Sequence, residues 1–418
     1  MTFGAVFVIA LSIPFVFRII YHALTLVSCS RPLPADVADI YSPEVYQKWQ
    51  SFKKESSRYY LFRSILATAV YLILAGTDIL YPLVMLFPLT KSAFILGPVL
   101  ICFFVSIAYV PFHYYDQMVL KKRYGFCKQT AKRFWKEQLL FILTFLSVGF
   151  IISCLMFLCF FENTKDATVV LLNKPSILPL AAGGLMLSVL MNPGYYLYRE
   201  IHDKKADLCK DGLKEEIDSI SSRLGFKGQI KVARSDREHN LNAYYTPIGN
   251  KVVLYDTLIE ALAEDEICGV VAHEIAHAKH GDFWMNLAAD ALLKLIACFA
   301  YWNQLNYCFS HAVLGMGPVI PLRDALLLIV SMFLYIPFSM MLRRYQARNS
   351  EFWADQTAVK CGYGESLISA LKKAAQADFE ELNPHPLLVA LFEFYPPLVH
   401  RIKRIRRRNS GETHCREE

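Results

Sequence analysis

Seven long apolar segments divide this chain and limit what it can fold into. Each holds about 20 residues or more, enough for an α-helix to cross the hydrocarbon core of a bilayer. The chain is 55% hydrophobic and only 19% charged, whereas soluble domains are nearer a quarter charged. We therefore expect a mainly α-helical, polytopic membrane protein. Its predicted membrane spans are residues 3–27, 64–88, 93–115, 139–161, 176–198, 284–309 and 322–342.

The segments between the spans predict the domain organisation. The expected parts are transmembrane helices one to five with their loops (1–198), a soluble insertion (199–283), transmembrane helices six and seven (284–342) and a C-terminal soluble part (343–418). Within the insertion, Gln229–Ala233 and Lys251–Tyr255 are short β-branched stretches that predict strands of a small β-sheet.

Lys and Arg residues concentrate in alternate loops. The basic loops are 28–63, 116–138 and 199–283, together with the C-terminal tail. By the positive-inside rule, the N-terminus is expected in a lumen or outside and the C-terminus in the cytosol. The formal net charge of +7 fits this asymmetry, so we expect membrane lipid and no nucleic acid as a partner.

Some residue types within the apolar segments need a protein or water environment. Asp78, Asp290 and Lys294 are costly in lipid, so they are expected to face a wet interior or to pair between helices. The 11 cysteines include no C-x-x-C pair. We interpret them as reduced thiols rather than as a disulfide framework.

The stretch 264–282 carries the strongest chemical signal. It contains His273-Glu274-Ile275-Ala276-His277, and residues four apart share one face of a helix, so both histidines can bind one metal ion. Glu274 can then take a proton from a water molecule at that ion. The alternative is a pair of ordinary surface histidines. The apolar surroundings disfavour it, because buried histidines need partners.

A catalytic zinc site needs a third protein ligand. The best candidate is Glu351, just beyond the seventh apolar segment, with Asp355 one helical turn later. Glu351 can bind the metal, and Asp355 can accept the ring N–H of a binding histidine. The alternative is a solvated acidic face. His280 lies three residues after His277 and is interpreted as a neighbour rather than a ligand.

The sequence resembles the type I CAAX prenyl endopeptidases, the Ste24-like integral-membrane zinc metalloproteases of family M48. The resemblance covers nearly the whole chain. The motifs that carry it are the H-E-x-x-H helix, Glu351-x-x-Ala-Asp355, Asn242-Ala-Tyr244, Val252-Val-Leu-Tyr-Asp-Thr-Leu258, Tyr124-Gly-Phe-x-Lys-Gln-Thr130 and Pro396-Pro-Leu-Val-x-Arg401.

This resemblance implies seven helices forming a barrel around a large water-filled chamber, with a zinc metalloprotease domain on its cytosolic side. It implies one Zn2+ per chain, held by His273, His277 and Glu351, with Glu274 as the catalytic base. It also implies that Asn242 and Ala243 lie on an edge strand that binds the substrate backbone. The implied membrane is that of the endoplasmic reticulum, with a lumenal N-terminus.

Two departures from the family pattern concern the site and the loop after the third span. Cys127 stands where the family usually has asparagine, and Tyr395 where it usually has a histidine that helps stabilise the tetrahedral intermediate. The Tyr395 hydroxyl is expected to donate a similar hydrogen bond, and His385 is another possible donor. Arg401 is expected near the peptide carbonyl, as a substrate-binding residue.

The expected function is zinc-dependent cleavage of the C-terminal tripeptide after the prenylated cysteine of CAAX proteins. The first alternative is a membrane quality-control metalloprotease of the same clan, acting on misfolded or stalled proteins. The second alternative, suggested by Tyr395, is a non-proteolytic membrane scaffold or lipid-binding protein with a degenerate site.

Overall fold

The computed structural model describes residues 3–76, 91–125, 129–161, 177–191, 193–202, 205–207, 211–234, 241–312 and 320–410. These residues form two compact units. The first unit comprises Met1–Ala23, Gln50–Leu187 and Ala291–Phe338, and the second comprises Leu24–Trp49, Ser188–Asp290 and Ser339–Glu418. Two of the residues discussed above, Asp78 and Cys127, lie outside the described ranges.

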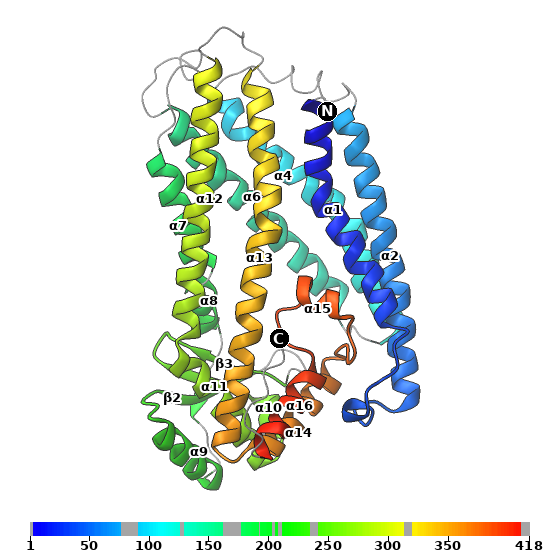
Figure 1. Cartoon of the computed structure of the whole chain (residues 1–418), viewed down its shortest axis with the longest axis vertical. Helices are drawn as coiled ribbons and strands as arrows, with labels where there is room; N and C mark the ends of the chain where they lie inside the picture. Colours follow the sequence, from blue (N-terminus) through cyan, green and yellow to red (C-terminus); the bar gives the residue numbers. More distant parts are fainter. Residues whose placement is uncertain are drawn as a thin grey trace. The chain divides into compact units, whose positions relative to one another are not determined.

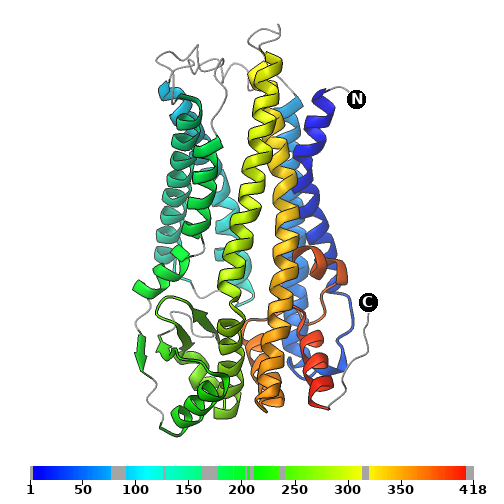
Figure 2. The same cartoon turned by 60° about the vertical axis from the view of Figure 1, so that its left-hand side comes forward.

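The first unit is helical throughout its described part. Its helices, some of which continue into the second unit, are α1 (Phe3–Ser28), α2 (Pro43–Gly76), α4 (Lys91–Tyr114), the π-helical turn η2 (Tyr115–Leu120), α5 (Lys121–Arg123), α6 (Ala131–Phe161), α7 (Ile177–Met191), α12 (Asp282–Ala312) and α13 (Ile320–Lys360). Helices α4 and α6 pack against each other, and α1 runs beside α2 in both Figure 1 and Figure 2.

Large apolar side chains on these helices are exposed, as is typical of helices that contact lipid. Phe62, Phe104 and Leu140 are each at least 60% exposed. Among the described residues, Ala131–Ile151 and Asp282–Ala300 are long and apolar enough to cross a membrane. They overlap the predicted spans 139–161 and 284–309.

The second unit contains the sheet and most of the shorter helices. Its elements are η1 (Ala35–Val37), α8 (Pro193–His202), β1 (Lys205–Asp207), α9 (Asp211–Leu224), β2 (Gln229–Ala233), β3 (Ala243–Thr246), β4 (Lys251–Tyr255), α10 (Asp256–Ala261), α11 (Glu264–His280), α14 (Gly364–Ala377), α15 (Pro386–Phe392) and α16 (Leu398–Asn409). The predicted strands 229–233 and 251–255 are β2 and β4. The short strand β1 was not predicted.

The sheet has the order β1-β2-β4-β3. Strands β2 and β4 are parallel, while β1 and β3 pair antiparallel with β2 and β4. Strand β3 is therefore an edge strand, as the family resemblance implied for Asn242 and Ala243. Helix α11 packs beside β3 and β4, which brings this edge of the sheet close to the H-E-x-x-H helix.

The core of this unit forms where α9, α11, α14 and α16 meet the sheet. Val271 and Ile275 of α11 are fully buried, as are Leu254 of β4 and Ile402 of α16. Burying one such side chain contributes about 1.5–3 kcal/mol. At Gly269 a Cβ atom would lie 3.2 Å from the backbone nitrogen of Leu367. The absence of a side chain there lets α14 approach α11 closely.

Ion pairing explains one charged residue of the sixth predicted span. Asp290 is buried and accepts a hydrogen bond from Nη1 of Arg343 at 3.0 Å. Pairing between helices therefore accounts for Asp290. The cysteines described with side chains form no disulfide, in agreement with the predicted reduced thiols; they are Cys29, Cys154, Cys268, Cys298 and Cys361.

Candidate metal centre

Both ends of helix α11 are stabilised by local interactions. Glu264, Asp265 and Glu266 occupy its first turn, where the helix dipole favours negative charge. The buried carboxylate of Glu266 accepts hydrogen bonds from the Ala263 backbone N–H at 2.7 Å and from Lys373 at 2.6 Å. At the other end, Gly281 stops the helix in the left-handed conformation, with φ of 71°.

The histidines of α11 converge on Glu351 of α13. Nε2 of His273 lies 3.2 Å from Nε2 of His277. The carboxylate of Glu351 lies 3.5 Å from the first of these atoms and 3.7 Å from the second. His273 is buried and the other two are partly buried. Among the described residues, these three form a group that can hold a metal ion.

The donor groups lie close enough together to hold one metal ion. With metal–ligand distances of about 2.0–2.2 Å and a tetrahedral angle, neighbouring donors lie about 3.3–3.6 Å apart. The two Nε2 atoms are 3.2 Å apart, Oε2 of Glu351 lies 3.5 Å from His273, and Oε1 lies 3.7 Å from His277. One donor atom from each residue lies within 4.8 Å of the others. Two facing Nε2 atoms also make a poor contact by themselves, since both present lone pairs when the Nδ1 atoms carry the protons. A cation between them removes this conflict.

Carboxylates orient both imidazole rings. Nδ1 of His273 lies 3.1 Å from Oδ1 of Asp355, the residue predicted to accept its ring N–H. Nδ1 of His277 lies 2.5 Å from Oδ2 of Asp282. The hydrogen bond to Asp282 places the ring proton of His277 on Nδ1 and leaves its Nε2 for a metal. The carboxylate of Asp355 favours the same arrangement at His273 by its charge. The role of Asp282 was not predicted from the sequence. Gly281, which precedes it, is a typical helix-ending residue and was the available signal.

Asp282 also joins α12 to α13. Its Oδ1 accepts a hydrogen bond from the Ser350 hydroxyl at 2.9 Å and contacts Nδ1 of His280. The ring of His280 stacks on Trp353, with centroids 5.2 Å apart. His280 is therefore a neighbour of the cluster through Asp282, in agreement with its interpretation from spacing.

Arg401 contacts the two carboxylates of the cluster, those of Asp355 and Glu351. Its guanidinium donates to Asp355 from Nε at 2.9 Å and from Nη2 at 2.6 Å, while Nη1 lies 3.2 Å from Glu351. The side chain is only 10% exposed. In the structure Arg401 thus binds the two acidic residues, and its predicted contact with substrate stays a prediction.

The electrostatics of the cluster favour a cation. Burial would lower the pKa of His273, but Asp355 and Glu351 raise it to about 10. Burial would raise the pKa of Glu351, but Arg401 and His273 lower it to about 2. Burial would also raise the pKa of Asp355, but Arg401 and His273 together hold it well below its usual range. The carboxylates therefore stay ionised and stabilise positive charge at the imidazoles.

Glu274 and Tyr395 are close enough to influence each other electrostatically. Glu274 is partly exposed on α11, next to His273. Tyr395 follows α15 and is 66% exposed. Its pKa is raised, first by partial burial and then by the nearby charges of Glu351 and Glu274. The Tyr395 hydroxyl therefore keeps its proton and is accessible to solvent. His385 instead caps α15, where its ring accepts the Leu387 N–H.

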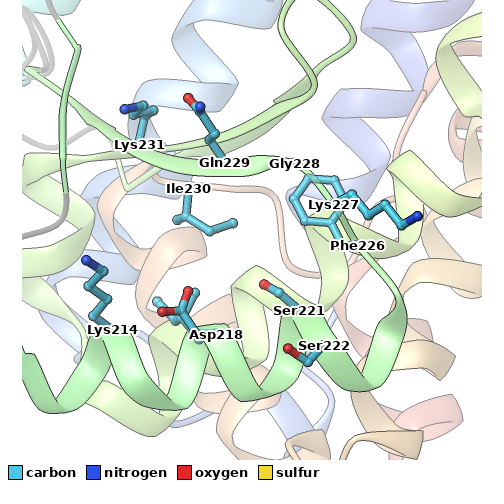
Figure 3. A pocket seen from close by; sticks show the side chains of 11 residues that line it. Lys214, Asp218, Ser221, Ser222, Phe226, Lys227, Gly228, Gln229, Ile230 and Lys231 are labelled. Atoms are coloured by element: carbon cyan, nitrogen blue, oxygen red, sulfur yellow. The ribbon is translucent and has the colours of Figure 1, made fainter.

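A cleft of about 460 Å3 lies elsewhere in the second unit, between α9 and β2. Figure 3 shows Asp218 and Ser221 on α9 facing Ile230 across the gap. None of the predicted site residues lines this cleft. We therefore assign the chemistry to the histidine cluster and not to the larger cavity.

Comparisons with known proteins give the family of this chain. Residues 208–409 match the family model of peptidase family M48, and residues 23–173 match the N-terminal region of CAAX prenyl proteases with five membrane helices. The chain is 31% identical to a CAAX prenyl protease 1 homolog of Arabidopsis thaliana, over 72% of this chain and 70% of the relative. This chain belongs to peptidase family M48.

Two further likenesses extend over most of this M48 peptidase. It is 27% identical to a CAAX prenyl protease 1 homolog of Oryza sativa subsp. japonica, over 88% of this chain and 89% of the relative. Its fold matches the crystal structure of S. mikatae Ste24p with a TM-score of 0.74 at 19% identity, covering 97% of this chain and 99% of the other.

These findings confirm several predictions. The M48 peptidase is a multi-pass membrane metalloprotease that is mostly helical and has a small sheet. The seven-helix barrel is consistent with the likeness to Ste24p. The roles of individual site residues and the domain boundaries stay predictions.

Proposed function

We propose that this M48 peptidase is a zinc-dependent endopeptidase that removes the C-terminal tripeptide after the prenylated cysteine of CAAX proteins. The observation that carries the proposal is the convergence of His273, His277 and Glu351 beside Glu274. The names of the two relatives described above supply the substrate class. The proposed location is the endoplasmic reticulum membrane. The charges of the loops favour a lumenal N-terminus and a cytosolic C-terminus.

The residues of the cluster suggest how the reaction proceeds. A zinc ion held by His273, His277 and Glu351 would polarise the scissile carbonyl and lower the pKa of a water molecule to about 7. Glu274 takes the proton of the attacking water and passes it to the leaving amine. Tyr395 donates its hydroxyl proton in a hydrogen bond to the oxyanion that develops on the carbonyl oxygen.

The backbone of the substrate has a matching edge. Strand β3 ends the sheet, Asn242 is exposed just before it, and the Asn242 carbonyl accepts the Tyr255 N–H at 3.2 Å. An extended peptide can add to the outer side of β3 by main-chain hydrogen bonds. We propose that Asn242 and Ala243 hold the substrate in this way.

The test is the Glu274→Gln variant in purified, full-length protein. We expect it to retain zinc, measured by elemental analysis, and to lose cleavage of a farnesylated C-a-a-X peptide. Undiminished cleavage by the variant would refute the role of Glu274 as the base. Equal cleavage of farnesylated and unfarnesylated peptides by the wild type would favour the quality-control alternative. Zinc binding without any proteolysis would favour the scaffold alternative.

A further inference from the structure

A second, smaller cavity adjoins the histidine cluster. Its volume is about 150 Å3, comparable to an engineered cavity of about 150 Å3 that accepts benzene. The residues that line it are Tyr196, Phe283, Asn286, Arg343, Ala347 and Phe394. The cavity combines aromatic walls with one amide and one guanidinium, which is the composition of a site for an apolar group that carries a negative charge.

The chain places this cavity directly beside the proposed catalytic residues. Ala347 lies one helical turn before Glu351 on α13, and Phe394 precedes Tyr395. Tyr196 is close enough to Tyr395 to contribute to its raised pKa, after the larger effects of burial, Glu351 and Glu274. A ligand that crosses the cluster can therefore extend into the cavity.

Arg343 is held in place by a buried partner. Its Nη1 donates to Asp290 at 3.0 Å, where the Asp290 side chain is 6% exposed and that of Arg343 is 31% exposed. A guanidinium has five N–H donors, so this bond leaves donors for a ligand in the cavity that Arg343 lines. Asp290 fixes the orientation of the guanidinium, which lowers the entropy cost of binding an anion.

The separation between Arg343 and the cluster fits three residues of extended peptide. Arg343 precedes Glu351 by eight residues on one helix, which places their Cα atoms about 12 Å apart along its axis. Three extended residues span about 10 Å. A peptide whose scissile carbonyl lies at Glu351 thus brings its third following residue, with the free α-carboxylate, to Arg343.

We propose that this cavity is a C-terminal pocket, in which Arg343 and Asn286 bind the free α-carboxylate of the substrate and the aromatic walls hold its last side chain. The inference rests on the proposed function and deepens it, because it explains how cleavage is directed three residues from a chain end. An Arg–carboxylate bond is charge-assisted and adds geometric specificity.

The experiment compares two farnesylated peptides that differ only in a C-terminal carboxylate or a C-terminal amide. For the wild type, we expect kcat/KM to be about 10- to 100-fold lower for the amide, mainly through KM, as for the loss of one hydrogen bond to a charged group. In the double variant Arg343→Gln, Asp290→Asn, the two peptides should be cleaved equally. The second substitution is needed because R343Q alone would leave Asp290 buried without its partner.

Two further variants sharpen the test. Arg407→Gln removes one positive charge from an exposed position of α16 and should preserve the difference between the carboxylate and the amide. Ala347→Leu reduces the space in the pocket and should raise KM more for peptides that end in Met than for those that end in Gly. The tripeptide product should inhibit the wild type competitively, and its amide should not.

The outcomes separate the inference from the proposed function. Equal cleavage of both peptides by the wild type would overturn the C-terminal pocket and leave the protease assignment intact. A preference for the carboxylate that survives in the double variant would also overturn it, because another residue would then bind that group. Cleavage of neither peptide by zinc-loaded protein would instead refute the proposed function.

Discussion

Arg401 donates two hydrogen bonds to the carboxylate of Asp355, at 2.9 and 2.6 Å, and its third nitrogen lies 3.2 Å from Glu351. One guanidinium thus compensates two buried carboxylates, one that orients His273 and one that is proposed to bind the metal. The sequence predicts that Arg401 lies near the substrate carbonyl. In the structure Arg401 instead contacts Asp355 and Glu351, and so holds these two carboxylates in position.

We predict that Arg401→Met destabilises the protein by about 3–5 kcal/mol, because it leaves buried carboxylates without their cation. Arg401→Lys should fall in between, since an ammonium keeps the charge but cannot form the two-pronged bond to Asp355. Thermal unfolding in detergent at saturating zinc measures both effects. A variant that unfolds like the wild type but has a raised KM would support the substrate-binding role instead.

Asp282→Ala should weaken zinc binding by about 10- to 100-fold, the usual effect of removing a carboxylate that holds a metal-binding histidine. The reason is that His277 loses the hydrogen bond between its Nδ1 and Oδ2 of Asp282, which is 2.5 Å long. Competition with a chelator measures the affinity directly. Ser350→Ala is the matched control, because it removes a 2.9 Å bond to Asp282 and leaves the contact with His277. Unchanged affinity in D282A would contradict this role.

Tyr395→Phe should lower kcat by about 100- to 1,000-fold with little change in KM, if its hydroxyl is the oxyanion donor. Because the pKa of Tyr395 is raised, through burial and then the charges of Glu351 and Glu274, the hydroxyl stays protonated beyond its ordinary range. Alkaline loss of activity below pH 10 should therefore not come from Tyr395. Tyr395→His, the residue usual in the family, should retain activity. Full activity of Y395F would place the donor elsewhere.

Glu266 should make the stability of the second unit sensitive to acid. Burial would raise its pKa, but hydrogen bonds from Lys373, Ser369 and the Ala263 N–H lower it below 4.5. A depressed folded-state pKa stabilises the fold above pH 4.5, and this contribution is lost as the pH falls through the folded-state value.

Glu266→Gln should therefore lower the unfolding temperature at pH 7 and reduce its dependence on pH below 4.5. Thermal unfolding of full-length protein across this range measures the effect. Glu264→Gln, at an exposed position of the same turn, is the matched control. The role of Glu266 would be wrong if both variants showed the acid dependence of the wild type.

Local patterns were sufficient for much of the fold and of the candidate site. The spacing of His273 and His277 on one helix face, the β-branched strands 229–233 and 251–255, and the four-residue step from Glu351 to Asp355 all depend on neighbours along the chain. Helix and strand periodicity fixes such relations before any tertiary contact forms. The closeness of Asp355 to His273 joins two helices, so this regularity does not fix it.

Relations between distant segments depended on the tertiary structure. The sequence by itself determined a polytopic helical protein with an H-E-x-x-H helix and an acidic partner helix, because length, hydropathy and period are local properties. Only the tertiary structure decided that Arg401 binds Asp355 and Glu351, that Asp282 orients His277, and that Arg343 pairs with Asp290 beside a cavity. The physical reason is that a side chain's partners are set by how helices pack, and packing depends on shape and burial across the whole unit.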